Sequence, residues 1–110
     1  MRKGIEYLDG DLLRKYKVSK WRYFDSEGLV YGHSSKIDVD ILISDDKHVI
    51  IEYKAFVDRS NVAELHRIGK LYEKVTGIKP YLLIITPNIR KRAKELADAL
   101  NIEVRGNIID

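Results

Sequence analysis

The chain has 110 residues, no cysteine, and a net charge of +3 from 20 Lys and Arg against 17 Asp and Glu. This length predicts one domain spanning residues 1–110 and is too short for a pair of Rossmann units, a β/α-barrel or a kinase. The lack of cysteine excludes a disulfide scaffold, a cysteine-based zinc site and a thiol nucleophile. No apolar run is long enough for a membrane span and the start has no signal-peptide pattern, so we expect a cytoplasmic protein.

The composition narrows the class of protein further. Apolar residues make up 45% of the chain, which is enough for one hydrophobic core and excludes a disordered tail. The pI near 9.1 allows a nucleic-acid partner, although a net charge of +3 is a weak bias. The sequence contains no glutamine and is rich in Lys, Arg and Glu, which is typical of hyperthermophile proteins, so we expect a thermophilic source.

The first half of the chain predicts a helix and then strands. Apolar side chains recur at helical spacing over residues 4–17, which predicts the first helix. Residues 21–23 and 29–31 flank a polar stretch that ends at Gly28, a pattern typical of a hairpin. Residues 37–43 alternate between apolar and polar side chains, which predicts a strand with one apolar face.

A turn at 45–47 leads into residues 49–57, whose β-branched side chains predict the next strand. Helical spacing returns over residues 60–76, and Gly77 suits the C-terminal cap of that helix. The continuous apolar run 81–86 is typical of a strand that is covered on both faces.

The last helix is predicted to start at Pro87, with Thr86 as its cap, and residues 102–104 predict a short final strand. Gly69, within the second helix, costs about 1 kcal/mol against Ala, which indicates close packing of that helix on the sheet. The order of elements is therefore α-β-β-β-α-β-α-β, an antiparallel meander followed by a helical crossover into a parallel strand. We expect an α/β fold with a mixed central sheet.

Acidic residues concentrate in the two strands around the turn at 45–47. Asp38 and Asp40 lie two apart on one strand, and Glu52 and Lys54 lie two apart on the next, so each pair shares a face. A three-residue loop would set Asp40 opposite Glu52 and Asp38 opposite Lys54. A two-residue loop would put Asp40 and Glu52 on opposite faces. The absence of Gly from the turn favours the longer loop.

Two opposed carboxylates would repel each other, and a hard divalent cation between them would remove the repulsion. Such an ion can polarise a phosphoryl oxygen and lower the pKa of a bound water. Lys54 could then orient the water or stabilise charge in the transition state. The alternative is a solvated strand face, on which Asp38 and Lys54 form an ordinary cross-strand ion pair.

The acidic residue on one strand, with Glu52, Tyr53 and Lys54 on its antiparallel neighbour, resembles the PD-(D/E)XK nuclease superfamily. The order of elements resembles the restriction-endonuclease-like αβββαβ core of that superfamily, followed by an extra helix and a short strand. A narrower resemblance is to an archaeal family of nuclease-like proteins, whose members often carry a coiled coil before this domain. The resemblance covers roughly residues 20 to 105 and rests on the segments 27–33, 37–40, 51–54 and 67–74.

The resemblance implies a metal centre and a catalytic residue. Asp40 and Glu52 would bind Mg²⁺ or Mn²⁺, with the main-chain carbonyl of Tyr53 as a further ligand. Lys54 would be the catalytic lysine, and Asp38 would be an accessory acid of the catalytic site.

The superfamily often adds a glutamate on its first helix, and Glu6 is the candidate. Arg90, Lys91 and Arg92 crowd the first turn of the last predicted helix, where cations oppose the helix dipole. Three cations at a position where the helix dipole disfavours them indicate contact with phosphate. Arg59 is a further candidate nucleic-acid contact. The alternative is a solvated basic face.

Two functions remain open from the sequence. The first is a metal-dependent deoxyribonuclease that hydrolyses phosphodiester bonds. The second is a catalytically inactive nuclease-fold module that serves DNA binding or protein assembly. A domain this small offers little surface for reading DNA, so we expect a homodimer or a partner subunit, and no membrane association.

Overall fold

The computed structural model describes residues 18–110. In order along the chain, these residues form β1 (Val18–Asp25), β2 (Ser35–Ser44), β3 (Lys47–Tyr53), α2 (Arg59–Thr76), β4 (Tyr81–Arg90), α3 (Lys91–Ala99) and β5 (Glu103–Ile109). The helix predicted over residues 4–17, and with it Glu6, lies outside the described residues.

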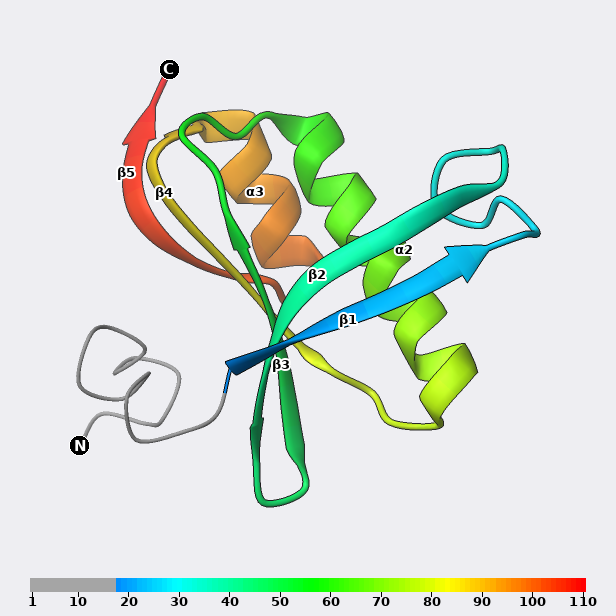
Figure 1. The fold of residues 1–110 in the computed structure, drawn as a ribbon. Helices are drawn as coiled ribbons and strands as arrows, with labels where there is room; N and C mark the ends of the chain where they lie inside the picture. The colour runs from blue at the N-terminus through cyan, green and yellow to red at the C-terminus, as the bar shows by residue number, and fades with distance from the viewer. Residues whose placement is uncertain (1–17) are drawn as a thin grey trace.

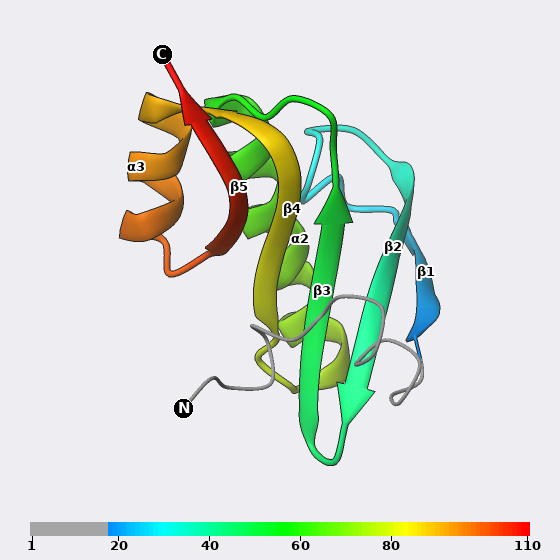
Figure 2. The same ribbon diagram turned by 90° about the vertical axis from the view of Figure 1, so that its left-hand side faces the viewer.

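The strands form one sheet in the order β1-β2-β3-β4-β5. The first three strands are antiparallel neighbours, whereas β3, β4 and β5 run parallel to one another. Helices α2 and α3 lie on the same face of this sheet, as Figures 1 and 2 show from two directions. The predicted α/β architecture with a mixed sheet is therefore confirmed.

The hydrophobic core lies between the sheet and the two helices. Ile50 and Ile84 from the central strands pack there with Leu65 of α2 and Ala93 of α3, and all four are buried. Leu42, Val49, Ile51 and Leu83 form a second buried cluster, from the opposite faces of their strands. Burial on both faces explains why β3 and β4 read as continuous apolar runs in the sequence.

Helix α2 approaches the sheet closely at Gly69. A Cβ atom built at this position would lie 3.0 Å from Cδ1 of Leu82 on β4, which is tighter than ordinary van der Waals contact. The predicted close packing of this helix on the sheet is confirmed. Gly77 ends the helix in the left-handed conformation, with φ of 78°, as its position in the sequence indicated.

Residues 29–31 do not form the strand that the sequence predicted. Strand β1 pairs directly with β2, and residues 26–34 form the loop between them. The backbone N–H of Val30 donates to the buried carboxylate of Asp25 over 2.9 Å, so a side chain takes the place of a strand partner.

The turn between β2 and β3 is shorter than predicted. Ser44 pairs with Lys47, so the loop contains only Asp45 and Asp46. Asp45 adopts the left-handed conformation, with φ of 57°, which Asp tolerates better than most residues other than Gly. The prediction of a three-residue loop is therefore wrong, because an aspartate replaces the expected glycine.

Strand β4 continues past the predicted end at Thr86 and reaches Arg90. The Thr86 hydroxyl donates to the carbonyl of Asn88, 3.0 Å away, and accepts from the Asn88 N–H. Pro87 lacks an N–H and sits in an irregular part of the strand, so neither Thr86 nor Pro87 starts the last helix. Helix α3 begins four residues later than predicted, at Lys91.

Strand β3 ends at Tyr53, earlier than predicted, and Val57 makes only an isolated bridge to Ile89. Backbone hydrogen bonds of Val57 with Asn88 and Arg90 hold the segment after β3 against the end of β4. Strand β5 is longer than the predicted 102–104 because it follows this extended part of β4.

Candidate active site

The two acids of β2 face cations on β1. Lys20 pairs with Asp40 in the strand register, and its Nζ lies 2.8 Å from Oδ1 of Asp40. Arg22 pairs with Asp38 in the same way, with Nε 3.2 Å from Oδ2. The expected opposition of Asp38 with Lys54 is wrong: the cross-strand ion pair exists, but its cation comes from β1.

Asp40 also marks the place where β2 and β3 stop pairing. The last pair is Asp40 with Ile51, which belongs to the second buried cluster. Glu52 pairs with Ile84 of β4, whose side chain packs on the helix side of the sheet. Strand alternation therefore puts Asp40 and Glu52 on opposite faces, and their predicted direct opposition is wrong.

The two carboxylates nevertheless interact, because Glu52 lies just beyond the paired part of the hairpin. Burial raises the pKa of Glu52 above its ordinary value, and the charges of Glu64 and Asp40 raise it further. The charge of Lys54 lowers the same pKa. Acidic groups from β2 and α2 thus act on one half-buried carboxylate of β3, which also feels the charge of a lysine.

Glu64 and Tyr31 are residues that the sequence reasoning missed. The Tyr31 hydroxyl donates to Oε2 of Glu64 over 2.7 Å. Burial, this hydrogen bond and the charges of Glu64 and Glu52 raise the pKa of Tyr31 to about 12. Nε of Arg67 donates to the Val30 carbonyl over 2.6 Å, so the loop carrying Tyr31 is held on α2.

Helical spacing alone could have drawn attention to Glu64, because it lies four residues before the buried Ile68. No local pattern places Tyr31, whose position depends on how the loop between β1 and β2 docks on α2.

Lys54 follows the end of β3, where its backbone N–H donates to the Ile85 carbonyl over 3.1 Å. Its charge helps to lower the pKa of Asp58, after larger effects from hydrogen bonds with Ser60 and Asn61. Asp58 is the N-cap of α2, so Lys54 interacts with Glu52 on one side and with the start of α2 on the other.

Glu52 and Asp40 provide the hard oxygen donors that a divalent cation prefers, and the Tyr53 carbonyl follows Glu52 directly in the chain. Within residues 18–110, no three His, Asp or Glu side chains gather closely enough to hold a metal ion. Mg²⁺ is commonly bound by one or two protein carboxylates and keeps several waters. The donor set therefore fits a cation that retains part of its water shell.

The four predicted nucleic-acid contacts occupy two helix N-termini. Arg59 opens α2, Arg90 is the N-cap of α3, and Lys91 and Arg92 follow in its first turn. Both helix starts lie at the same end of the molecule, at the top of Figure 1. This end is also where β4 and β5 finish.

Arg90 is already engaged within the fold. Its guanidinium lies over the Phe56 ring, 5.3 Å from the centroid, and its Nη1 donates to the Asp110 carbonyl over 2.8 Å. Lys91 and Arg92 are exposed, and no ion pair joins either of them to an acid among the described residues. These two side chains are the better placed for a phosphate partner.

Residues 35–103 match the model of the PD-(D/E)XK nuclease superfamily. The chain belongs to this superfamily. PD-(D/E)XK nucleases generally use divalent metal ions, so the donor set beside Lys54 agrees with the chemistry of the family. The match is to the superfamily as a whole, and the narrower archaeal family stays a prediction.

Several solved structures share the fold at low sequence identity. The apo structure of EndoMS has a TM-score of 0.61 and 16% identity, and covers 86% of this chain and 39% of its own. A repair endonuclease from Pyrococcus abyssi has a TM-score of 0.57 and 20% identity, and covers 64% of this chain and 33% of its own. A complex of EndoMS with double-stranded DNA has a TM-score of 0.56 and 18% identity, and covers 81% of this chain and 36% of its own.

The chain thus spans less than half the length of each of these solved proteins. A search of curated proteins gives no significant match. The predicted restriction-endonuclease-like fold is confirmed by the structural neighbours. Neither described helix is long and apolar enough to cross a membrane.

Proposed function

We propose that the protein is a metal-dependent nuclease that hydrolyses phosphodiester bonds in DNA. The observation that carries this proposal is the placement of Asp40 at the last β2–β3 pair, with Glu52 and then Lys54 following directly where the two strands separate. The family adds support, because its members are nucleases. A fold alone does not determine an activity, so the proposal depends on these side chains.

Asp40, Glu52 and the Tyr53 carbonyl would hold Mg²⁺ or Mn²⁺. When bound, such an ion supplies Lewis-acid chemistry at a phosphoryl oxygen and acidifies a coordinated water. Lys54 would orient the attacking water and stabilise negative charge as the phosphorus–oxygen bond breaks. Asp38 would act as an accessory acid, after release from its ion pair with Arg22.

Two features of the chain would compete with the metal ion. The Lys20 ammonium neutralises Asp40 and must yield to the cation. Glu52 has a raised pKa and must lose its proton, so metal binding should weaken as the pH falls through that pKa. Because of these two effects, binding of the metal ion would depend on the pH and on the metal concentration.

Double-stranded DNA is the substrate class that we propose, since EndoMS, which shares the fold, was solved with double-stranded DNA. Lys91 and Arg92 at the start of α3 would contact its phosphates, with Arg59 at the start of α2. Because one domain of this size contacts little of a duplex, we propose that it works as a homodimer or with a partner subunit.

The test is a plasmid-nicking assay with Mg²⁺ or Mn²⁺, together with a calorimetric titration of Mn²⁺. Wild type should bind Mn²⁺ and nick the plasmid only when metal is present. Glu52→Gln should lose Mn²⁺ binding, and Lys54→Ala should keep it while nicking falls by about 10²-fold or more. Glu95→Gln, an exposed acid on α3, is the matched control and should behave as wild type.

Absence of Mn²⁺ binding by the wild type would refute the metal-dependent nuclease. Mn²⁺-independent, salt-sensitive DNA binding without nicking would instead support the inactive DNA-binding module. Charge reversal at Lys91 and Arg92 should weaken DNA binding in either case, because both functions place DNA phosphates at the start of α3.

A further inference from the structure

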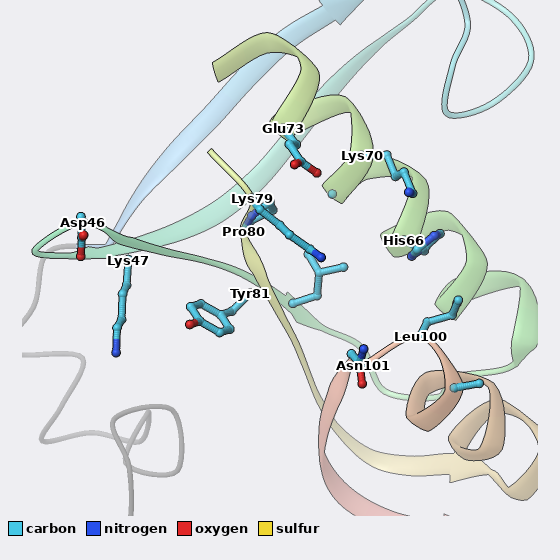
Figure 3. A pocket seen from close by; sticks show the side chains of 13 residues that line it. Asp46, Lys47, His66, Lys70, Glu73, Lys79, Pro80, Tyr81, Leu100 and Asn101 are labelled. Carbon is cyan, nitrogen blue, oxygen red and sulfur yellow. The ribbon is translucent and has the colours of Figure 1, made fainter. Parts of the chain in front are cut away.

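A cleft of about 790 Å³ lies away from the candidate active site, at the N-terminal end of β4. One of its walls is α2, which contributes His66, Lys70 and Glu73 (Figure 3). Lys79, just before β4, and Tyr81, its first residue, also line it, and Lys47 comes from the start of β3. This volume is typical of ligand pockets, so the cleft has room for a short segment of a ligand.

The cleft carries cations without partners in the described chain. Lys47, Lys70 and Lys79 are exposed, and no ion pair joins any of them to an acid within residues 18–110. Val49 pairs with Tyr81, so the start of β3, which carries Lys47, lies beside the start of β4, two residues after Lys79. Lysines from three segments of the chain therefore line this cleft, where they offset the lining acids and favour an anionic ligand.

His66 adds a group that can respond to an anion. Burial lowers the pKa of His66, and the charges of Lys70 and Arg67 on the same helix lower it further. Lys79, Leu100 and Asn101 face this part of α2 across the cleft, as Figure 3 shows. A bound anion would offset the neighbouring cations and raise the pKa of His66 again.

Tyr81 supplies a flat aromatic surface among these cations. Its side chain is 50% exposed, although Tyr81 is the first residue of a central strand. In Figure 3 its ring lies near both Lys47 and Lys79. An exposed aromatic ring flanked by lysines is the arrangement that stacks on nucleobases while cations contact the phosphates. Bases within a duplex are already stacked on one another, so this surface suits an unpaired strand.

We infer that this cleft binds a single-stranded nucleic-acid segment, with Tyr81 stacked on a base and Lys47, Lys70 and Lys79 on phosphates. This inference rests on the proposed function, in which the partner is a nucleic acid. It adds a second contact at the N-terminal end of β4, whereas Lys91 and Arg92 lie beyond its C-terminal end. The cleft would retain an unpaired strand at a distance from the candidate active site, and it would bind such a strand without metal.

The experiment is fluorescence anisotropy with a labelled oligothymidine, in EDTA, at several salt concentrations. The double variant Lys70→Ala and Lys79→Ala should bind about tenfold more weakly, and the slope of log K against log salt should fall by about 1.4. Tyr81→Ala should lose fivefold or more, roughly the effect of one stacked base, whereas Tyr81→Phe should bind as wild type. Lys36→Ala, an exposed lysine on β2, is the matched control.

NMR adds a readout that a purely structural role would not give. The pKa of His66, followed through its imidazole signals, should rise when oligothymidine is added to wild type, and the double variant should need about tenfold more oligothymidine for the same rise. Circular dichroism on each variant confirms that it is folded before binding is measured.

The possible outcomes separate the two proposals. If the double variant and Tyr81→Ala bind oligothymidine as tightly as wild type, the cleft is not the site, whatever the nicking assay gives. A wild type that nicks plasmid but does not bind oligothymidine also overturns the cleft and leaves the nuclease standing. A Glu52→Gln variant that loses nicking yet keeps oligothymidine binding supports both proposals.

Discussion

Gly106 on β5 offers a sharp test of the packing between β4 and β5. Ile85 pairs with Arg105 and Asn88 with Asn107, so Thr86 and Pro87 of β4 oppose Gly106 alone. This two-against-one arrangement is a β-bulge. A Cβ atom added at Gly106 would lie 1.7 Å from the Thr86 carbonyl oxygen and 2.8 Å from its carbon.

The substitution Gly106→Ala should therefore be strongly destabilising. Ordinary van der Waals contact begins at 3.4 Å, so the new Cβ atom and the Thr86 oxygen must separate by 3.4 − 1.7 = 1.7 Å. The obstacle is backbone rather than a flexible side chain, so relief requires the two strands to move. Overpacking costs about 1–3 kcal/mol and occasionally more, and we expect the upper end, about 3 kcal/mol.

Thermal unfolding followed by circular dichroism measures this loss. For a domain of this size 1 kcal/mol lowers Tm by about 4–8 °C, so Gly106→Ala should lower Tm by about 12 °C or more. Gly77→Ala is the control, because Gly77 has φ of 78° but no atom within 4 Å of the added Cβ. It should lose only the conformational cost, about 1–2 kcal/mol.

A Gly106→Ala protein within about 0.5 kcal/mol of wild type would refute the reasoning, since surface substitutions without a special role fall in that range. A loss equal to that of Gly77→Ala would also contradict it, because backbone conformation and not the clash would then explain the effect.

Three further variants examine the candidate active site. Glu52 has a pKa raised above its ordinary value of 4.5 in the folded state, so the wild type loses stability as the pH rises through that pKa. Urea unfolding should therefore show Glu52→Gln becoming more stable relative to wild type as the pH rises above 4.5, and a constant difference would contradict the raised pKa. Lys20→Ala should tighten Mn²⁺ binding in calorimetry because it frees Asp40, and weaker binding would exclude competition between the ammonium and the metal. Tyr31→Phe removes the hydrogen bond to Glu64 and should cost about 0.5–1 kcal/mol in chemical denaturation, an effect that should vanish in a Glu64→Ala background, which has no acceptor.

The elements with long, regular patterns were predictable from the sequence. The helix predicted over 60–76 agrees with α2 within one residue at its start, and Gly77 ends it as expected. The strand predicted over 37–43 is contained in β2. In these segments periodicity and capping chemistry indicate the same structure, so a local pattern was sufficient.

The errors occur where a side chain replaces a backbone partner or where distant segments decide the local structure. Asp45 occupies a conformation expected of Gly, which shortened the turn. The Thr86 hydroxyl bonds to Asn88 instead of capping a helix, and Val57 pairs with the same stretch of β4. Neither contact has a signature in the neighbouring sequence, so β4 was predicted too short.

The candidate site was predictable in its composition but not in its contacts. The acidic residues and Lys54 were identified by their types and spacing, and all of them lie within residues 35–103, the part of the chain that matches the superfamily. Their neighbours were not identified: Lys20 and Arg22 pair with the two aspartates because β1 lies beside β2, a relation between distant segments. Glu64 interacts with Glu52 only because α2 crosses the sheet at that point.

The ion pairs between β1 and β2 also bear on how this protein would respond to its metal supply. Since Lys20 and Arg22 already compensate Asp40 and Asp38, the acids of β2 do not need a cation before the sheet can form. The chain would therefore stay folded when divalent metal is scarce. It would regain the proposed nuclease activity once metal ions bind again. Removing the metal with a chelator would then stop the proposed activity reversibly without unfolding the chain. Small zinc domains differ, because they unfold when their metal is removed.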